Sequence, residues 1–272
     1  MTESPTPDIS FLDAPVISSR LFHPRPEWDN GKTRQGSRDY LIPVTGGEVI
    51  GARLHGENRE GPNILFFHGN GEIVGDYDDL APIYTSLGIN FIVADYRGYG
   101  RSTGHPTVSA MLGDAREIFN FFQDLLSLEK CTGPLVIMGR SLGSASALEI
   151  AETYEDRIDG LIIESGFARI VPLLRLIGAD PLPGEITESL DRFNLSRISA
   201  FRKPLLVIHA EFDHIIPLAD GEALFAACPS EEKTFLKIPG ANHNDIFLRG
   251  FRAYMEAVSG LTRRLAEKRR KD

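Results

Sequence analysis

One serine of this chain stands in a context that can make it a nucleophile. Ser141 is the centre of Gly139-Arg140-Ser141-Leu142-Gly143, which follows the apolar run Pro134–Met138 and opens the helix-like stretch Ala145–Ile150. A strand before this pattern and a helix after it predict a sharp turn that lifts the serine Oγ above the edge of a sheet. Glycine on both sides removes the Cβ atoms that would collide in such a turn. A turn that only caps the helix is the alternative, and the flanking elements favour the nucleophile.

A serine nucleophile needs a general base, and seven histidines compete for that role. His243 follows the last apolar run, Phe235–Ile238, and precedes the last helical stretch, so its loop can fold back over Ser141. His68 comes too early in the chain order expected for such a nucleophile, and we interpret it as structural. The remaining five are predicted to be surface or packing residues: His23, His55, His105, His209 and His214.

The acid that orients the base is predicted to be Asp213. It follows the apolar run Leu205–Ile208, on a loop at the sheet end where the imidazole would be held. Other carboxylates remain open as alternatives: Glu164, Glu211 and Asp245. The cluster of His209, Glu211, Asp213 and His214 has none of the common zinc spacings, so no metal site is predicted.

The developing oxyanion needs two backbone donors. One is expected from Leu142, the residue after the nucleophile, and the other from the loop His68-Gly69-Asn70-Gly71, which follows an earlier strand. We therefore predict that the N–H groups of Leu142 and Asn70 form the oxyanion hole. Three residues are predicted to bind the substrate: Gly69, Arg140 and Phe167.

Short apolar runs that alternate with amphipathic stretches position these residues. The runs are Tyr40–Val44, Glu48–Leu54, Ile64–Phe67, Phe91–Ala94, Leu135–Met138, Leu161–Ile163, Leu205–Ile208 and Phe235–Ile238. The helical stretches are Leu80–Leu87, Ala110–Leu128, Ser144–Tyr154, Leu218–Ala227 and Ile246–Glu267. This alternation predicts an α/β fold with a mostly parallel, doubly wound sheet of about eight strands and helices on both faces.

The domain boundaries follow from where this pattern holds. Residues 1–39 are rich in proline and poorly patterned, and they predict an irregular arm lying over a single domain of residues 40–272. About forty residues separate the runs at Leu161–Ile163 and Leu205–Ile208, far more than a plain crossover requires. We interpret residues 167–199 as a short helical lid; an ordinary crossover helix with a long loop is the alternative.

Bulk composition excludes several classes of function. The net charge of −9 argues against a nucleic-acid partner, because phosphate binding needs a basic face. No run approaches the roughly 18 apolar residues of a membrane span, and the start of the chain lacks the pattern of a secretory signal. The expected location is the cytoplasm, without stable membrane insertion.

Two further features carry no chemistry. Cys131 and Cys228 precede strands that we expect to lie about three places apart, too far for a disulfide. The glycine-rich loop Asp95–Ser102 has neither phosphate-loop nor dinucleotide spacing, so no cofactor is predicted. We expect this loop to support the oxyanion side of the site.

Three motifs in order resemble the α/β-hydrolase superfamily from about Tyr40 to the C-terminus. They are His68–Gly71, Asp95–Ser102 and Gly139–Gly143, and they are most similar to a small-lid branch that includes acyl-protein thioesterases and lysophospholipase-like enzymes. One departure is visible, since His209-Ala210 stands where the family has His-Gly, and this change affects nothing catalytic. The resemblance implies cleavage of ester, thioester or occasionally amide bonds.

The resulting hypothesis is a serine hydrolase that cleaves carboxylic esters through an acyl-enzyme. Its substrate would be a small acyl ester or thioester, with Ser141, His243 and Asp213 as the triad. A thioesterase or aminopeptidase with the same triad, and a non-catalytic binding protein, remain open. The oligomeric state cannot be derived from the sequence.

Overall fold

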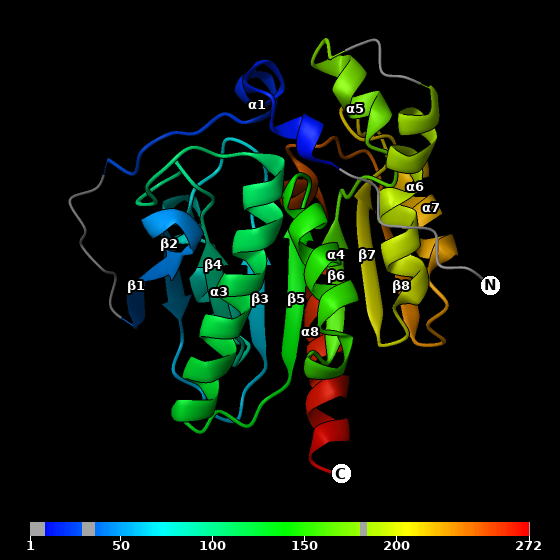
Figure 1. The fold of residues 1–272 in the computed structure, drawn as a ribbon. Coiled ribbons are helices and arrows are strands. Elements are labelled where there is room, and N and C mark those ends of the chain that lie inside the picture. The colour runs from blue at the N-terminus through cyan, green and yellow to red at the C-terminus, as the bar shows by residue number, and fades with distance from the viewer. Residues whose placement is uncertain (1–8, 29–35, 180–183, 272) are drawn as a thin grey trace.

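An eight-stranded sheet runs through the centre of the computed structural model, which describes residues 9–28, 36–179 and 184–271 (Figure 1). The strands are β1 Ser37–Val44, β2 Glu48–His55, β3 Asn63–Phe67, β4 Asn90–Ala94, β5 Leu135–Arg140, β6 Gly160–Glu164, β7 Leu205–Ala210 and β8 Lys233–Ile238, in the order β1-β2-β4-β3-β5-β6-β7-β8. Strand β2 is antiparallel to both of its neighbours, β1 and β4. In the sheet order, the six strands from β4 through β3 to β8 are mutually parallel. The predicted fold class is confirmed.

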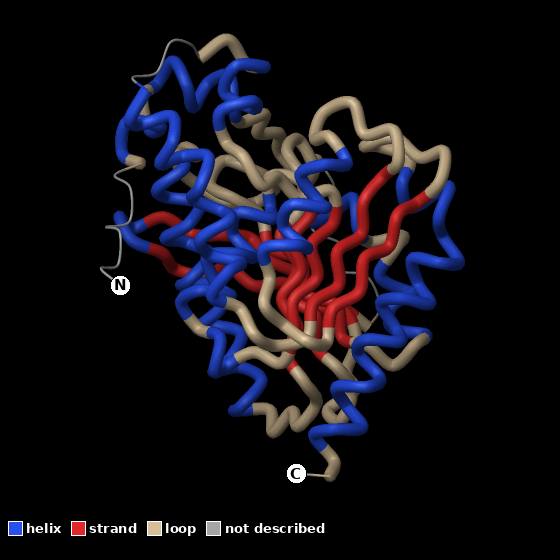
Figure 2. Tube along the Cα trace, turned by 90° about the vertical axis from the view of Figure 1, so that its right-hand side faces the viewer, coloured by secondary structure: helices blue, strands red, loops and turns tan. Residues whose placement is uncertain are grey.

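Helices cover both faces of this sheet (Figures 1 and 2). They are α1 Pro15–Leu21, α2 Ala81–Ser86, α3 Val108–Leu128, α4 Gly143–Thr153, α5 Val171–Leu176, α6 Gly184–Ala200, α7 Leu218–Ala227 and α8 Ile246–Arg269. One face packs against α3, α4, α6 and α7, and the other against α2 and α8. The central strands are apolar throughout because both faces are covered: in β3, Leu65 and Phe67 point to one core, and Ile64 and Phe66 to the other.

The carboxyl ends of the parallel strands meet at one edge of the sheet, here called the carboxyl edge. Ser141 follows β5, Glu164 ends β6, and the loops with Asp213 and His243 follow β7 and β8. The loop His68–Gly71 follows β3, the neighbour of β5. Figure 1 shows α1 and α5 above this edge. The order of strands therefore brings together residues far apart in the chain, such as Ser141 and His243, which are 102 positions apart.

The insertion between β6 and β7 contains both a crossover helix and a short helix in the position of a lid. Helix α6 packs Leu190, Phe193 and Ile198 into the core on the face covered by α3, α4, α6 and α7, here called the main core, as a crossover helix would. The short helix α5 lies at the carboxyl edge, as a lid would. Residues 180–183, within the predicted lid, lie outside the described residues.

Within its described residues 9–28, the N-terminal arm is more regular than its sequence predicted. It contains a 3-10 turn, Ser10–Asp13, followed by α1, and it buries Leu12, Ile17 and Phe22 in the main core. Strand β1 begins at Ser37, three residues before the expected start of the domain. The prediction of an irregular arm was wrong here, because burial of three apolar side chains stabilises a helix that its own seven residues could not maintain.

Both cysteines are free, as predicted. Cys131 precedes β5 and Cys228 precedes β8, and these strands stand three places apart in the sheet. The thiol pKa of Cys228 is raised by burial.

The turn at Ser141 depends on close backbone packing. A Cβ on Gly143 would lie 2.1 Å from the carbonyl oxygen of Phe67 at the end of β3, and one on Gly139 would lie 2.4 Å from the carbonyl oxygen of Gly143. Neither obstacle is a flexible side chain, so neither can move aside. The two glycines therefore allow the turn to approach the neighbouring strand.

This packing yields a stability prediction. Gly143→Ala should lower the free energy of unfolding by about 1–3 kcal/mol or more, because the added methyl group overlaps backbone atoms. The matched control is Gly113→Ala within α3, where the nearest atom to the new Cβ is Arg116 Nη2 at 3.9 Å. The control should be neutral or up to about 1 kcal/mol more stable. Urea unfolding of both variants checks this, and equal stability of the two would contradict it.

Candidate active site

Three side chains form a continuous hydrogen-bonded chain at the carboxyl edge. Ser141 Oγ lies 2.9 Å from His243 Nε2, and His243 Nδ1 lies 2.7 Å from Asp213 Oδ2. Because an ionised carboxylate can only accept, Nδ1 carries the imidazole proton and Nε2 accepts from the serine hydroxyl. All three residues are buried. The structure thus brings together the predicted nucleophile, base and acid in the arrangement that proton transfer from Ser141 requires.

Ser141 occupies a strained backbone position at the start of α4. Its φ is +51°, a region that non-glycine residues rarely adopt. Its N–H donates to Glu164 O at 2.9 Å, and its own carbonyl accepts from Ser144 Oγ at 2.7 Å. These bonds hold the turn in the strained conformation, and such strain is common at functional sites.

Asp213 is fixed by two backbone amides as well as by His243. Oδ1 accepts from the N–H groups of Ile215 and Ile216 at 3.0 and 2.8 Å. Burial alone would raise the pKa of Asp213, but the hydrogen bond and charge of His243, together with these amides, lower it overall. The carboxylate therefore stays ionised and keeps the imidazole oriented.

The alternative acids are engaged elsewhere. Glu164 accepts from Tyr254 Oη and Arg140 Nε, Glu211 from the N–H of Gly240, and Asp245 from the N–H of Asn242. His209, the nearest competing histidine, donates its Nε2 proton to Ile216 O, and burial lowers its pKa. It is a packing residue, as predicted.

Arg140 connects three parts of the site beneath Ser141. Its guanidinium donates to Glu164 at 3.1 Å, to Glu72, and to the carbonyl oxygen of His243 at 2.9 Å. Burial by itself would lower the pKa of Arg140, but the two carboxylates outweigh it and raise the pKa. These donors hold the loop of the base, and because Arg140 also lines the cavity that contains Ser141, its predicted substrate-binding role stays a prediction.

Gly69 does not lie where its predicted substrate-binding role requires. It is absent from the lining of the cavity beside Ser141, and its N–H donates to Glu72 Oε2 at 2.6 Å. A Cβ there would lie 2.4 Å from Arg140 Nη1. Gly69 therefore makes room for the Arg140–Glu72 pair.

The two predicted oxyanion donors belong to residues that line one cavity with Ser141. Within residues 9–28, 36–179 and 184–271, no acceptor is paired with the backbone N–H of Leu142 or of Asn70. His68 is structural: its ring bonds Asp95 Oδ1 at 3.2 Å. The loop Asp95–Ser102 supports the Asn70 side, since Tyr99 Oη donates to Asn70 Oδ1 at 2.7 Å.

An apolar cavity of about 300 Å³ opens above Ser141. Its apolar lining is Leu21, Leu142, Phe167, Leu173, Leu176, Ile177, Ile215 and Ile216, and its polar lining is Arg20, His23, Asn70, Glu72, Arg140, Ser141, His243 and Asn244. Phe167 is in contact with this space, as its prediction required. The contribution of α5 agrees with the predicted lid. The contribution of α1 was missed, because nothing in its short sequence says which cavity it covers.

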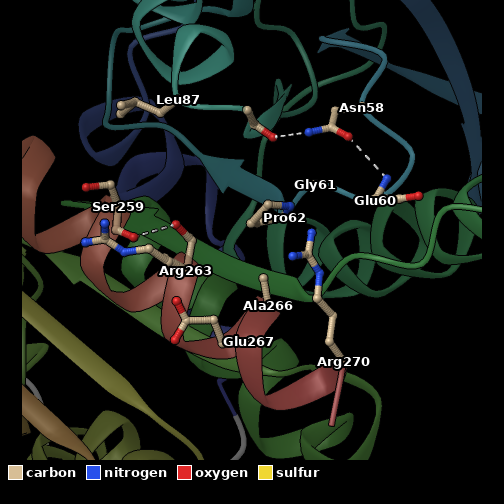
Figure 3. Close-up of a pocket in the computed structure, with 12 residues that line it drawn as sticks. Asn58, Glu60, Gly61, Pro62, Leu87, Ser259, Arg263, Ala266, Glu267 and Arg270 are labelled. Atoms are coloured by element: carbon tan, nitrogen blue, oxygen red, sulfur yellow. Dashed lines mark hydrogen bonds between the residues drawn. The ribbon is translucent and has the colours of Figure 1, made fainter. Parts of the chain in front are cut away.

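A larger cavity lies away from these residues. It has a volume of about 570 Å³ and lies between the Asn58–Pro62 loop and α8 (Figure 3). Its lining contains no member of the hydrogen-bonded chain, and Asn58 uses its side chain on Gly88 O and on the N–H of Glu60. We assign no chemistry to it.

Among residues 9–28, 36–179 and 184–271, no three His, Cys, Asp or Glu side chains are grouped to hold a metal ion. No helix in the same ranges combines the length and the apolar character needed to cross a membrane.

Comparison with known proteins points to one superfamily. Residues 60–182 match the family described as serine aminopeptidase, S33. The protein bem46 of Schizosaccharomyces pombe is 30% identical over 192 residues, which cover 69% of this chain and 63% of that protein. The lysophosphatidylserine lipase ABHD12 of Rattus norvegicus is 31% identical over 198 residues, which cover 65% of this chain and 48% of that protein. The matched region thus spans less than two thirds of either relative.

A solved structure supports the fold. The esterase Pf2001 of Pyrococcus furiosus superposes with a TM-score of 0.68 at 15% sequence identity, over 85% of this chain and 93% of the esterase. At this identity the likeness concerns the fold alone.

Proposed function

We propose that this chain, which belongs to the α/β-hydrolase superfamily, is a serine hydrolase that cleaves carboxylic esters of apolar acyl groups. The observation that carries the proposal is the hydrogen-bonded chain from Ser141 through His243 to Asp213, at the floor of an apolar cavity. Ester cleavage needs a nucleophile, a base held in one tautomer and a place for the acyl group, and these three stand together here.

The mechanism has two halves. Ser141 Oγ attacks the ester carbonyl carbon while His243 Nε2 takes its proton, and the amides of Leu142 and Asn70 stabilise the oxyanion. The carbon–oxygen bond to the alcohol then breaks, and the alcohol leaves with the proton from His243. Water next attacks the acyl-serine, again giving a proton to His243, and the acid leaves as the proton returns to Ser141. Asp213 stabilises the imidazolium in both halves.

Ester cleavage is favoured over aminopeptidase activity by the charges of the cavity. An aminopeptidase must bind a substrate ammonium group, which calls for a free carboxylate. Among the described lining residues the only carboxylate is Glu72, and it already accepts from Arg140, Tyr77 and Gly69. The rat relative named as a lysophosphatidylserine lipase supports an acyl substrate. A thioester remains a second acyl substrate, and the cytoplasm remains the expected location.

The nucleophile can be tested directly. Ser141→Ala should fold normally and lose turnover by several orders of magnitude, because no other group can form the acyl-enzyme. The assay is a panel of p-nitrophenyl esters of rising acyl length, matched thioesters and aminoacyl amides. A fluorophosphonate probe should label the wild type and Ser86→Ala, a change in an exposed serine away from the site, but not Ser141→Ala. Most activity retained without Ser141 would contradict the proposal.

The acid can be separated from its neighbours. Asp213→Asn should lower kcat by about 10³–10⁴-fold, because an amide that donates to Nδ1 stabilises the wrong tautomer. Glu211→Gln, on the same loop, should stay close to wild-type turnover. The reverse pattern, with activity lost on changing Glu211 alone, would move the acid to that position. Steady-state kinetics on one ester suffices.

The role of Arg140 predicts a kcat effect. Arg140→Lys should lower kcat by about 10–100-fold with little change in KM, because one ammonium cannot hold Glu72, Glu164 and the His243 carbonyl together. The control is Arg116→Lys, whose partner Glu149 lies outside the site. A large rise in KM with unchanged kcat would instead return Arg140 to substrate binding.

A further inference from the structure

The loop that carries Asn70 has a glycine on each side of this residue. These are Gly69 and Gly71, and Gly71 has a φ of +76°. Glycine on both sides leaves the direction of the intervening amide poorly determined, because glycine accesses more of the backbone dihedral range than any other residue. An oxyanion donor must nevertheless point at one position within a few tenths of an ångström. Something outside the loop has to fix Asn70.

The side chain of Asn70 is clamped on both of its polar atoms. Nδ2 donates to Leu21 O at 2.6 Å and to His23 Nδ1 at 2.9 Å. Oδ1 accepts from the N–H of His23 at 3.0 Å and from Tyr99 Oη at 2.7 Å. Tyr99 Oη in turn accepts from the same His23 N–H at 2.7 Å. Three of these partners belong to the arm, and the fourth is a tyrosine that the arm itself contacts.

The arm is attached firmly enough to act as an anchor. Phe22, between the two clamping residues, is 3% exposed and belongs to the main core. The N–H of Gly100 donates to Arg25 O at 2.9 Å, and Arg25 Nε donates to Gly71 O at 2.7 Å. The clamp therefore connects the oxyanion loop to the hydrophobic core and to the loop that follows β4.

We propose that residues Leu21–His23 of the N-terminal arm, with Tyr99, position the oxyanion hole by fixing the Asn70 side chain and hence the direction of its backbone N–H. This inference rests on the proposed function. Leu21, His23 and Tyr99 are positioning residues, because they act on the reaction through Asn70. The arm then contributes to catalysis by orienting the backbone N–H of Asn70.

The first test changes the hydroxyl that joins the arm to Asn70. Tyr99→Phe should lower kcat about tenfold or more, approaching the 10²–10³-fold loss of a removed oxyanion donor, with KM nearly unchanged. The inhibition constant of a trifluoromethyl ketone, whose serine adduct places an oxyanion in the same position, should rise by the same factor. The matched control is Tyr154→Phe, which removes a hydroxyl bonded to Asn120.

The second test removes the backbone donor of the arm. His23→Pro deletes the N–H that reaches Asn70 and Tyr99, and the extended conformation of Phe22, with φ −100° and ψ 137°, permits a following proline. Its control is His23→Ala, which keeps this N–H and loses only the ring. The proline variant should lose at least about tenfold in kcat relative to the alanine variant, with a parallel rise in the inhibition constant.

Either pair of variants decides the inference by itself, so a variant that fails to fold leaves the other pair to decide. Thermal unfolding establishes folding. A purely structural clamp would lower the melting temperature and leave both kcat and the inhibition constant within twofold of the control, and that result would overturn the inference. If the turnover of the wild-type protein did not depend on Ser141, this result would overturn the proposed function, and the inference with it.

Discussion

The contact between Gly143 and the carbonyl oxygen of Phe67 is the constraint on which the site depends. It lets the turn after β5 lie directly against the end of β3, at a distance where a Cβ would be only 2.1 Å from that oxygen. Ser141 then projects from the carboxyl edge with a φ of +51°, and Leu142 and Asn70 line the same cavity as Ser141. Backbone amides make effective oxyanion donors only when the fold places them before reaction, since no reorganisation is then required.

A buried group of charges supports the same edge from below. Arg140 lies between Glu72 and Glu164 and also donates to the carbonyl of His243, so the loop of the base is tied to the turn of the nucleophile. Such a group contributes little net stability, because desolvation of the charges offsets their attraction. Removing only one of these charged side chains lowers stability, because its partner is then left buried and unpaired. We interpret the role of this group as holding the loop of His243 in place against the turn of Ser141. The arm is proposed to act comparably through neutral hydrogen bonds to Asn70.

Much of the fold followed from local patterns, and the exceptions have physical reasons. The helix Leu218–Ala227 was predicted with the bounds that the structure has, and the six parallel strands were found because a sheet covered on both faces needs continuous apolar runs. Helix α1 was missed because seven residues do not show a period, and burial of Ile17 stabilises it. Arg140 and Gly69 were expected to bind substrate because they stand beside Ser141 and Asn70. Their positions in the chain do not say that both donate to Glu72.

By itself, the sequence determined which residue types could react and in what order they meet the sheet, because strand and helix periodicity are local properties. It therefore predicted Ser141, Asp213 and His243 as candidates for one site. Only the tertiary structure decided how these candidates are held. The pairs that do so, Arg140 with Glu72 and Asn70 with the arm, join residues 68 and 47–49 positions apart. Such contacts depend on which side chains the completed fold leaves facing each other, and no local pattern records that.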